Sequence, residues 1–280
     1  MATSNQPLDR SDRRRRRYSS DLSNREWAII QPLLAQTSGP GRPRTVDLRA
    51  IVNAIFYINR TGAQWRLLPK DFPAWSHVYY YFRKWSRDGT WRRINDALRA
   101  KVRVGVGKLA DPTAAIIDTQ SVKTTEAGGP RGFDAHKQIN GRKRHVVVDT
   151  LGLLLIVVVH AASIQDPAGA KLALTPLIGR FPRLALMWAD GIYRGPLVEW
   201  VREQLGCALS IVTRTAGQRG FQALPKRWIV ERTLAWLNRN RRLSKDYEHD
   251  LHASESMVYL ASIRLLLRRL DKQQRAVSST

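Results

Sequence analysis

The sequence predicts an all-α domain followed by an α/β domain, in which a mixed five-stranded sheet carries helices on both faces. First, residues 21–107 repeat their apolar positions at helical spacing. Second, short apolar runs of strand length alternate with helical segments over residues 108–270. Third, 280 residues are enough for one sizeable core and a smaller domain. Residues 1–20 are expected to be a basic disordered tail, and residues 271–280 a polar tail.

Capping residues mark the helices of the first domain. Ser23, followed three residues later by Glu26, forms a capping box that opens one helix. Asp47 is expected to cap a second helix, because its carboxylate can accept from the free N–H groups of the first turn. Four helices are therefore predicted, over residues 24–36, 48–60, 76–87 and 91–104.

The charge of the chain points to a polyanionic partner. Lys and Arg outnumber Asp and Glu by 47 to 23, which gives a formal net charge of +24. No apolar run approaches the 18 or so residues of a membrane span, and the N-terminus lacks a secretory pattern. Cys207 is the single cysteine, so neither an internal disulfide nor a cysteine zinc site is possible. We therefore expect a soluble, cytoplasmic protein that binds nucleic acid.

Two segments of the N-terminal part are candidates for DNA contact. Short turns between its helices suit a helix-turn-helix reader of duplex DNA, with Arg83 and Lys84 as contacts. The alternative is a small helical domain whose aromatic residues only form a core. Arg13 to Arg17 could lie along phosphates, and a solvated tail without a partner is equally compatible with that run.

The second half has the element order of a ribonuclease-H-like fold. A buried strand is followed by a hairpin, and then helices and strands alternate up to a final helix. The strands are expected over residues 114–122, 144–149, 153–159, 184–190 and 207–212. The helices are expected over residues 166–178, 196–204 and 227–242.

Three acidic residues fall on three core elements of this domain. Asp118 interrupts an apolar strand, Asp190 ends another strand before a glycine, and Glu231 lies on the last helix. At about 100° per residue, Arg227 and Arg242 project to the same side of that helix as Glu231. Each acid alone suits a cap or a surface ion pair. Together, in so basic a chain, they predict a site for a divalent cation, whose hard oxygen ligands favour Mg²⁺ or Mn²⁺.

Several motifs in this order resemble bacterial insertion-sequence transposases of the DDE type, in the group of insertion sequence five. They include Ile117-Asp118-Thr-Gln-Ser-Val-Lys123, Ala189-Asp190-Gly-Ile-Tyr193 and Arg227-Trp-Ile-Val-Glu231-Arg-Thr, and the likeness covers about residues 20 to 270. The family implies a ribonuclease-H-like catalytic domain with Asp118, Asp190 and Glu231 as its metal-binding triad. Where the family pattern has a tyrosine and a lysine, this chain has Leu224 and Asn238. Arg239, Arg242 or Lys245 could supply the missing cation.

The resemblance implies DNA cleavage and joining with two metal ions about 4 Å apart, which activate the nucleophile and stabilise the leaving oxygen. In this hypothesis Asp118 bridges both ions, while Asp190 and Glu231 hold one each. Arg227 would position a phosphate or Glu231 itself. The remaining cations expected along the DNA strand are Lys123, Lys137, Arg142, Lys143 and Arg144.

The function expected from these features is that of a transposase that binds the terminal inverted repeats of its element and catalyses strand cleavage and transfer. Two ends must meet, so a homodimer on double-stranded DNA is expected in the synaptic complex. The alternative is a catalytically decayed copy that acts as a DNA-binding repressor. His136 and His145 are interpreted as non-ligands, and Met187, Trp188 and Trp228 as core residues.

Overall fold

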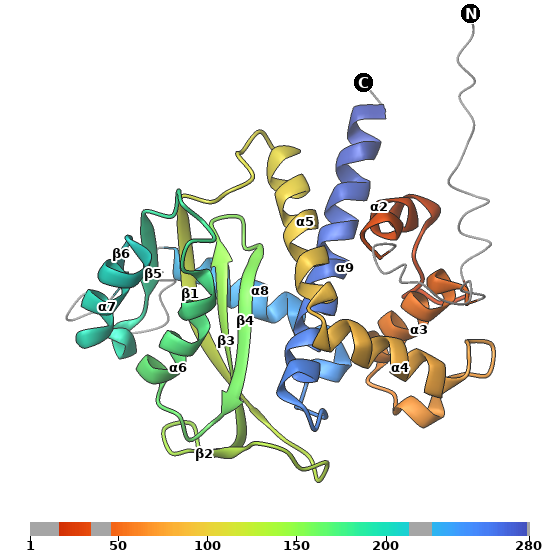
Figure 1. Cartoon of the computed structure of the whole chain (residues 1–280), viewed down its shortest axis with the longest axis horizontal. Helices are drawn as coiled ribbons and strands as arrows, with labels where there is room; N and C mark the ends of the chain where they lie inside the picture. Colours follow the sequence, from red (N-terminus) through yellow and green to blue (C-terminus); the bar gives the residue numbers. More distant parts are fainter. Residues whose placement is uncertain (1–16, 35–45, 213–225, 279–280) are drawn as a thin grey trace, which may run out of the picture.

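The structure is a computed structural model that describes residues 17–34, 46–212 and 226–278. A mainly helical part and a sheet lie side by side, with α5 and α9 between them (Figure 1). Residues 13–16 of the basic run, the arginine-containing segment at 39–44 and Leu224 lie outside the described residues. The helical part contains α2 (Asn24–Leu34), α3 (Leu48–Thr61), α4 (Trp75–Arg87), α5 (Thr90–Val104), α9 (Leu251–Ser278) and the 3₁₀ turn η1 (Trp65–Leu67).

The predicted caps of the first two helices are present. The Ser23 N–H donates to Glu26 Oε2 at 2.8 Å, and the Glu26 N–H donates to Ser23 Oγ at 3.0 Å. This reciprocal pair satisfies two backbone donors that the helix itself leaves without partners. Asp47 Oδ1 accepts from the N–H groups of Arg49 and Ala50 at the start of α3. The capping interpretation of both sites is confirmed.

Helix α9 corrects the predicted C-terminal boundary. The expected polar tail from residue 271 belongs to the last turns of this 28-residue helix. Residues 271–278 contain neither proline nor glycine, so nothing in the chain ends the helix earlier. Asn59 on α3 donates to the Met257 carbonyl at 2.9 Å, and Arg264 pairs with Glu26 at 3.1 Å. The last helix therefore completes the core of the N-terminal domain.

The sheet has six strands rather than five, in the order β2-β3-β1-β5-β6, and β4 pairs with β3 on the edge opposite β1, next to the stretch that pairs with β2. Strand β3 runs antiparallel to β1 and β4, while β5 is parallel to both β1 and β6. The additional strand is β2, which lies between the strands predicted over residues 114–122 and 144–149 and pairs with the start of β3. The strands are β1 (Ala114–Lys123), β2 (Gly132–Asp134), β3 (Ile139–Asp149), β4 (Leu154–Ala161), β5 (Leu186–Ala189) and β6 (Ala208–Ile211).

Alternating side chains divide the sheet between two cores. Ile116 and Val146 pack with the helical part, whereas Ala115, Ile117 and Val147 face the opposite side. The second core is covered by α6 (Asp166–Leu174) with its 3₁₀ extension η2 (Thr175–Leu177), by η3 (Gly191–Tyr193) and by α7 (Pro196–Leu205). A mixed sheet with helices on both faces confirms the ribonuclease-H-like prediction.

The last predicted helix is shorter than expected. Helix α8 spans Arg227–Leu237, and after it the chain turns into η4 (Arg241–Leu243). Asn238 is the C-terminal cap, and its N–H bonds the Leu234 carbonyl at 2.9 Å. Because the helix ends there, Arg242 does not share the face of Glu231 as the helical projection predicted. Among the residues that the structure describes, no helix is long and apolar enough to cross a membrane.

Candidate active site

Three separate elements bring the predicted acids together. The parallel register of β1 and β5 pairs Ile116 with Trp188, so continuing both strands by two residues brings Asp118 and Asp190 to the same level. Asp190 follows β5 directly and caps η3, accepting from the Ile192 N–H at 3.1 Å. Glu231 lies one turn into α8, which packs on β1 and β3. The three carboxylates therefore come from different elements and lie in one region, beside β1 and the end of β5.

The guanidinium of Arg227 stands at the point where the acids converge. Its Nη2 atom lies 3.7 Å from Asp118 Oδ2, 3.5 Å from Asp190 Oδ2 and 3.6 Å from Glu231 Oε1. One cationic nitrogen is thus nearly equidistant from three carboxylates on β1, after β5 and on α8. Arg227 comes one turn before Glu231 on the same helix face, so the spacing of four residues delivers both groups to the centre.

Asp118 is the most buried of the three acids, with 13 % of its side chain exposed, against 28 % for Asp190 and 46 % for Glu231. Burial raises the pKa of the Asp118 carboxyl from 3.8 to about 6, because desolvation disfavours the charged form. The Thr119 N–H and Arg227 oppose this rise in pKa, while the charge of Asp190 adds to it. The site therefore lacks enough positive charge to hold Asp118 at its ordinary pKa.

The three carboxylates are suitable ligands for a divalent metal ion. In the structure, however, their oxygens are spaced around the guanidinium of Arg227. Carboxylate oxygens are the ligands that Mg²⁺ prefers, at about 2.0–2.1 Å. The oxygens lie 3.5–3.7 Å from Arg227 Nη2, so they would have to close in by about 1.5 Å around an ion at that point. In the part of the chain that the structure describes, no group of three His, Cys, Asp or Glu residues is spaced to hold an ion.

The cations predicted to contact DNA fall into two sets. The exposed set, which solvent and a DNA strand can reach, comprises Arg83, Lys123, Arg239 and Lys245, with Lys84 half-buried. The second set is buried and paired within the protein, and it comprises Arg142, Lys143, Arg144 and Arg242.

The buried set corrects the prediction that these side chains line the path of a DNA strand. Arg142 is fully buried and pairs with Asp246 at 3.0 Å. Arg144 donates to the Leu243 carbonyl at 2.8 Å, and Arg242 pairs with Glu248 at 2.8 Å. Lys143 pairs with Asp166 at 2.9 Å. A buried cation needs a carboxylate or carbonyl groups as partners. These four residues therefore hold helix α6, and also the loop that follows α8, against the sheet.

Of the three residues interpreted as core beside the acids, Trp228 differs from that interpretation. Trp228 is 44 % exposed rather than part of the core, and the Arg232 guanidinium stacks on its ring at 4.5 Å. Its position between Arg227 and Ile229 turns it away from the sheet, which helical spacing alone could have indicated. Met187 is fully buried as expected, and Trp188 packs partly buried against the core.

Lys137 is the second cation close to Asp118. Its Nζ lies 3.4 Å from the Thr119 carbonyl, and its charge lowers the pKa of Asp118. Buried Tyr193, in the motif after Asp190, has its pKa raised by burial and by the neighbouring acids. Lys137 was among the predicted DNA contacts, and Tyr193 belongs to the motif around Asp190. Their proximity to Asp118 could not be predicted, because it depends on how distant segments pack together.

Comparison with known proteins agrees with this geometry. The model of the family "Transposase DDE domain" matches residues 109–267, which is more than half of the chain and contains all three acids. The chain belongs to the DDE transposase family. A second family model, "Putative transposase of IS4/5 family", matches residues 22–95, the helical part that precedes this DDE domain.

One curated relative is the "Insertion element IS402 uncharacterized 16.2 kDa protein" of Burkholderia cepacia. It is 32 % identical over 113 residues, which are 38 % of this chain and 75 % of the relative. A solved structure, the Mos1 mariner paired end complex with Mn, aligns over 89 % of this chain and 86 % of its own, with 10 % identity and a TM-score of 0.26. That score is too low to support any argument about this DDE domain.

Proposed function

We propose that this member of the DDE transposase family binds the terminal inverted repeats of its own element and catalyses metal-dependent cleavage and transfer of DNA strands. The observation that carries the proposal is the convergence of Asp118, Asp190 and Glu231 on one point, where each lies within 3.5–3.7 Å of the same guanidinium nitrogen. Three carboxylates that meet at one cationic point in a chain of net charge +24 suit a metal ion and a phosphodiester.

Asp118, Asp190 and Glu231 are the residues that would hold Mg²⁺ or Mn²⁺. The metal, when bound, supplies activation of the attacking oxygen and neutralisation of charge on the leaving oxygen. Asp118 lies on the central strand β1 and is the most buried of the three acids, so it would hold the metal from the interior side of the site. Because burial raises the pKa of Asp118 to about 6, metal binding there should weaken as the pH falls below about 6 and the carboxylate becomes protonated.

Arg227 has two successive roles in this proposal. In the structure its single positive charge lies among the three acids and offsets part of their negative charge. With Asp118, Asp190 and Glu231 holding a metal ion, the Arg227 guanidinium, whose side chain is 17 % exposed, would be available to bind another anion. A guanidinium at the rim of the site is well placed to hold a DNA phosphate by bidentate hydrogen bonds.

The exposed cations supply the surface for DNA in this proposal. Lys123 and Lys137 extend from the end of β1 and the β2–β3 turn, and Arg239 and Lys245 follow α8. In the helical part, Arg83 on α4 is exposed and stacks on Tyr79 at 5.8 Å. The protein would act on double-stranded DNA as a homodimer, because the two ends of an element have to be held together during strand transfer.

The experiment is a gel assay with labelled duplexes that carry the inverted repeats flanking the coding sequence. We expect strand cleavage and transfer that require Mg²⁺ or Mn²⁺ and stop on addition of EDTA. Asp118→Asn and Glu231→Gln should abolish both reactions while retaining DNA binding. Lys108→Gln, at an exposed lysine outside the site, is the matched control. Cleavage that survives Asp118→Asn would exclude this active site, and binding without cleavage by the wild type would favour the repressor alternative.

A further inference from the structure

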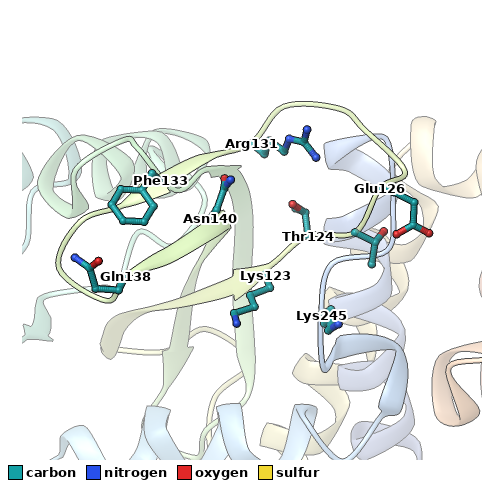
Figure 2. Close-up of a pocket in the computed structure, with 9 residues that line it drawn as sticks. Lys123, Thr124, Glu126, Arg131, Phe133, Gln138, Asn140 and Lys245 are labelled. Carbon is teal, nitrogen blue, oxygen red and sulfur yellow. The ribbon is translucent and has the colours of Figure 1, made fainter.

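A polar cavity lies at the C-terminal end of β1, about five residues beyond Asp118. It has a volume of about 570 Å³ and is lined by the end of β1, the β2–β3 hairpin and the loop at Lys245. Figure 2 shows Phe133 and Gln138 of the hairpin on one side of this cavity and Lys245 on the other. At about 3.3 Å per residue, Lys123 is roughly 17 Å along the strand from Asp118.

The charges of this cavity suit a phosphate group. Lys123, Arg131 and Lys245 line it together with a single carboxylate, that of Glu126. The Asp246 N–H donates to the Lys123 carbonyl at 2.8 Å, which fastens the loop of Lys245 beside the end of β1. Lys123 and Lys245, which are far apart in the sequence, are thereby held beside the same cavity. The neighbouring guanidinium of Arg142 forms an ion pair with Asp246 in the interior.

An exposed aromatic ring suits the face of a nucleobase. Phe133 is 51 % exposed and belongs to neither of the two hydrophobic cores, although it lies on a paired strand. An apolar ring left in solvent gains free energy only when a partner covers it, and every base has a flat face that can stack on it. The strand pairing of Phe133 with Asn140 places a side-chain amide beside the ring.

The hairpin turn brings a second amide to the same cavity at a conformational cost. Gln138 has a φ of 54°, in the left-handed region that residues with a side chain rarely occupy. Asp134 fixes this turn, because its Oδ1 accepts from the N–H groups of His136 and Lys137 at 3.0 and 3.1 Å. The amides of Gln138 and Asn140 provide both donors and acceptors, which the edge of a base can match.

We propose that this cavity binds one unpaired nucleotide of a DNA strand, with its phosphate on Lys123 and Lys245, its base stacked on Phe133 and its base edge facing Gln138 and Asn140. The volume lies within the range of small-molecule pockets, about 300–1,000 Å³, and suits a single nucleotide rather than a duplex. The separation of about 17 Å from Asp118 equals about five nucleotides at 3.4 Å each along one strand. The inference rests on the proposed function, because it assigns to the cavity the strand that the active site acts on.

The test compares two duplexes with equal numbers of phosphates, one fully paired and one with a short unpaired extension, in the absence of a divalent metal. We expect the full-length protein to bind the extended duplex about tenfold more tightly, because stacking of one base on an aromatic ring strengthens binding by about this factor. Phe133→Ala should remove this preference, and Phe133→Tyr should retain it. Leu172→Ala, which truncates a similarly exposed apolar residue on α6, is the control and should also retain it.

A fluorescent adenine analogue in the extension reports stacking directly. Its emission should be quenched on binding to the wild type and to Phe133→Tyr, and remain unchanged with Phe133→Ala. Lys123→Gln and Lys245→Gln should weaken binding and each lower the slope of log affinity against log salt by about one. Free thymidine monophosphate at matched concentration should compete poorly, and strong competition would indicate a site for free nucleotides and overturn the proposal.

The proposal is overturned if the wild type shows no preference for the extended duplex, or if Phe133→Ala keeps the preference with an unchanged circular dichroism spectrum. Both results are independent of catalysis, because binding is measured without metal. Loss of Mg²⁺-dependent cleavage with the preference intact would refute the proposed function alone. Normal cleavage of the inverted repeats with no effect of Phe133 on the preference would refute the cavity alone.

Discussion

Replacement of Asp118 by asparagine should make the metal-free protein more stable above pH 6. Asparagine resembles the protonated carboxyl and can keep the acceptor for the Thr119 N–H, which lies 2.8 Å away. The pKa of Asp118 is raised from 3.8 to about 6 by burial, so the folded state holds its proton more tightly than the unfolded state does. Wild-type stability is consequently lost as the pH rises through this interval, and the variant escapes that loss.

The size of the effect follows from the two pKa values. Multiplying the difference between 3.8 and about 6 by 1.36 kcal/mol per pKa unit gives about 3 kcal/mol in the free energy of unfolding. The stability difference between Asp118→Asn and the wild type should be near zero at pH 3, grow between pH 4 and 6, and level off above about pH 6. In a chain of this size it corresponds to a rise of roughly 6–12 °C in the melting temperature.

The assay is thermal or urea unfolding from pH 3 to pH 8 in EDTA, so that no bound cation offsets the charge of the acids. Asp111→Asn, which makes the same substitution at a half-buried aspartate outside the site, is the control. The reasoning is refuted if Asp118→Asn is less stable than the wild type at pH 8. It is equally refuted if the difference between them does not change from pH 4 to pH 6.

Three further predictions concern Arg227, Asp246 and Gly129. Arg227→Gln should raise the pKa of Asp118 further, because a cation that lowers it is removed, and should move the pH-dependent loss of stability to higher pH in the same unfolding series. Asp246→Ala should lower the free energy of unfolding by about 3–5 kcal/mol in urea titrations, since it leaves the fully buried guanidinium of Arg142 without its carboxylate. Gly129→Ala should lower the melting temperature, because φ is +86° and a Cβ would lie 2.0 Å from the His249 carbonyl oxygen; an unchanged melting temperature would contradict this close approach.

The parts of the site that could be predicted from the sequence are those set by local periodicity. An acid in an apolar strand, an acid before a glycine at a strand end, and an Arg–Glu pair four residues apart on a helix each have a defined direction. Those directions identified Asp118, Asp190 and Glu231 as candidate metal ligands and paired Arg227 with Glu231, whereas their convergence on one point depends on strand pairing and helix packing. The capping residues Ser23, Glu26 and Asp47 could be predicted for the same reason, because a cap depends on neighbours within one turn.

The positions of the remaining cations could not be predicted in this way. Arg142 and Lys123 both belong to basic, polar segments around the β-strands, and the sequence predicts the same role for both. Strand pairing and the loop after α8 separate them, because one side chain meets Asp246 in the interior while the other stays in solvent. The partner lies more than a hundred residues away, so no local pattern indicates it.

The sequence by itself determined the class of the domain, the three acids and their basic setting, because each depends on residue type and on spacing along one element. The tertiary structure alone decided that Arg227 occupies the centre of the acids, that four of the cations are internal, and that α9 completes the N-terminal core. It also created the cavity at Phe133. These features arise where segments distant in the chain pack together, and the free energy of burying a charge or a ring depends on what the other segment brings to it.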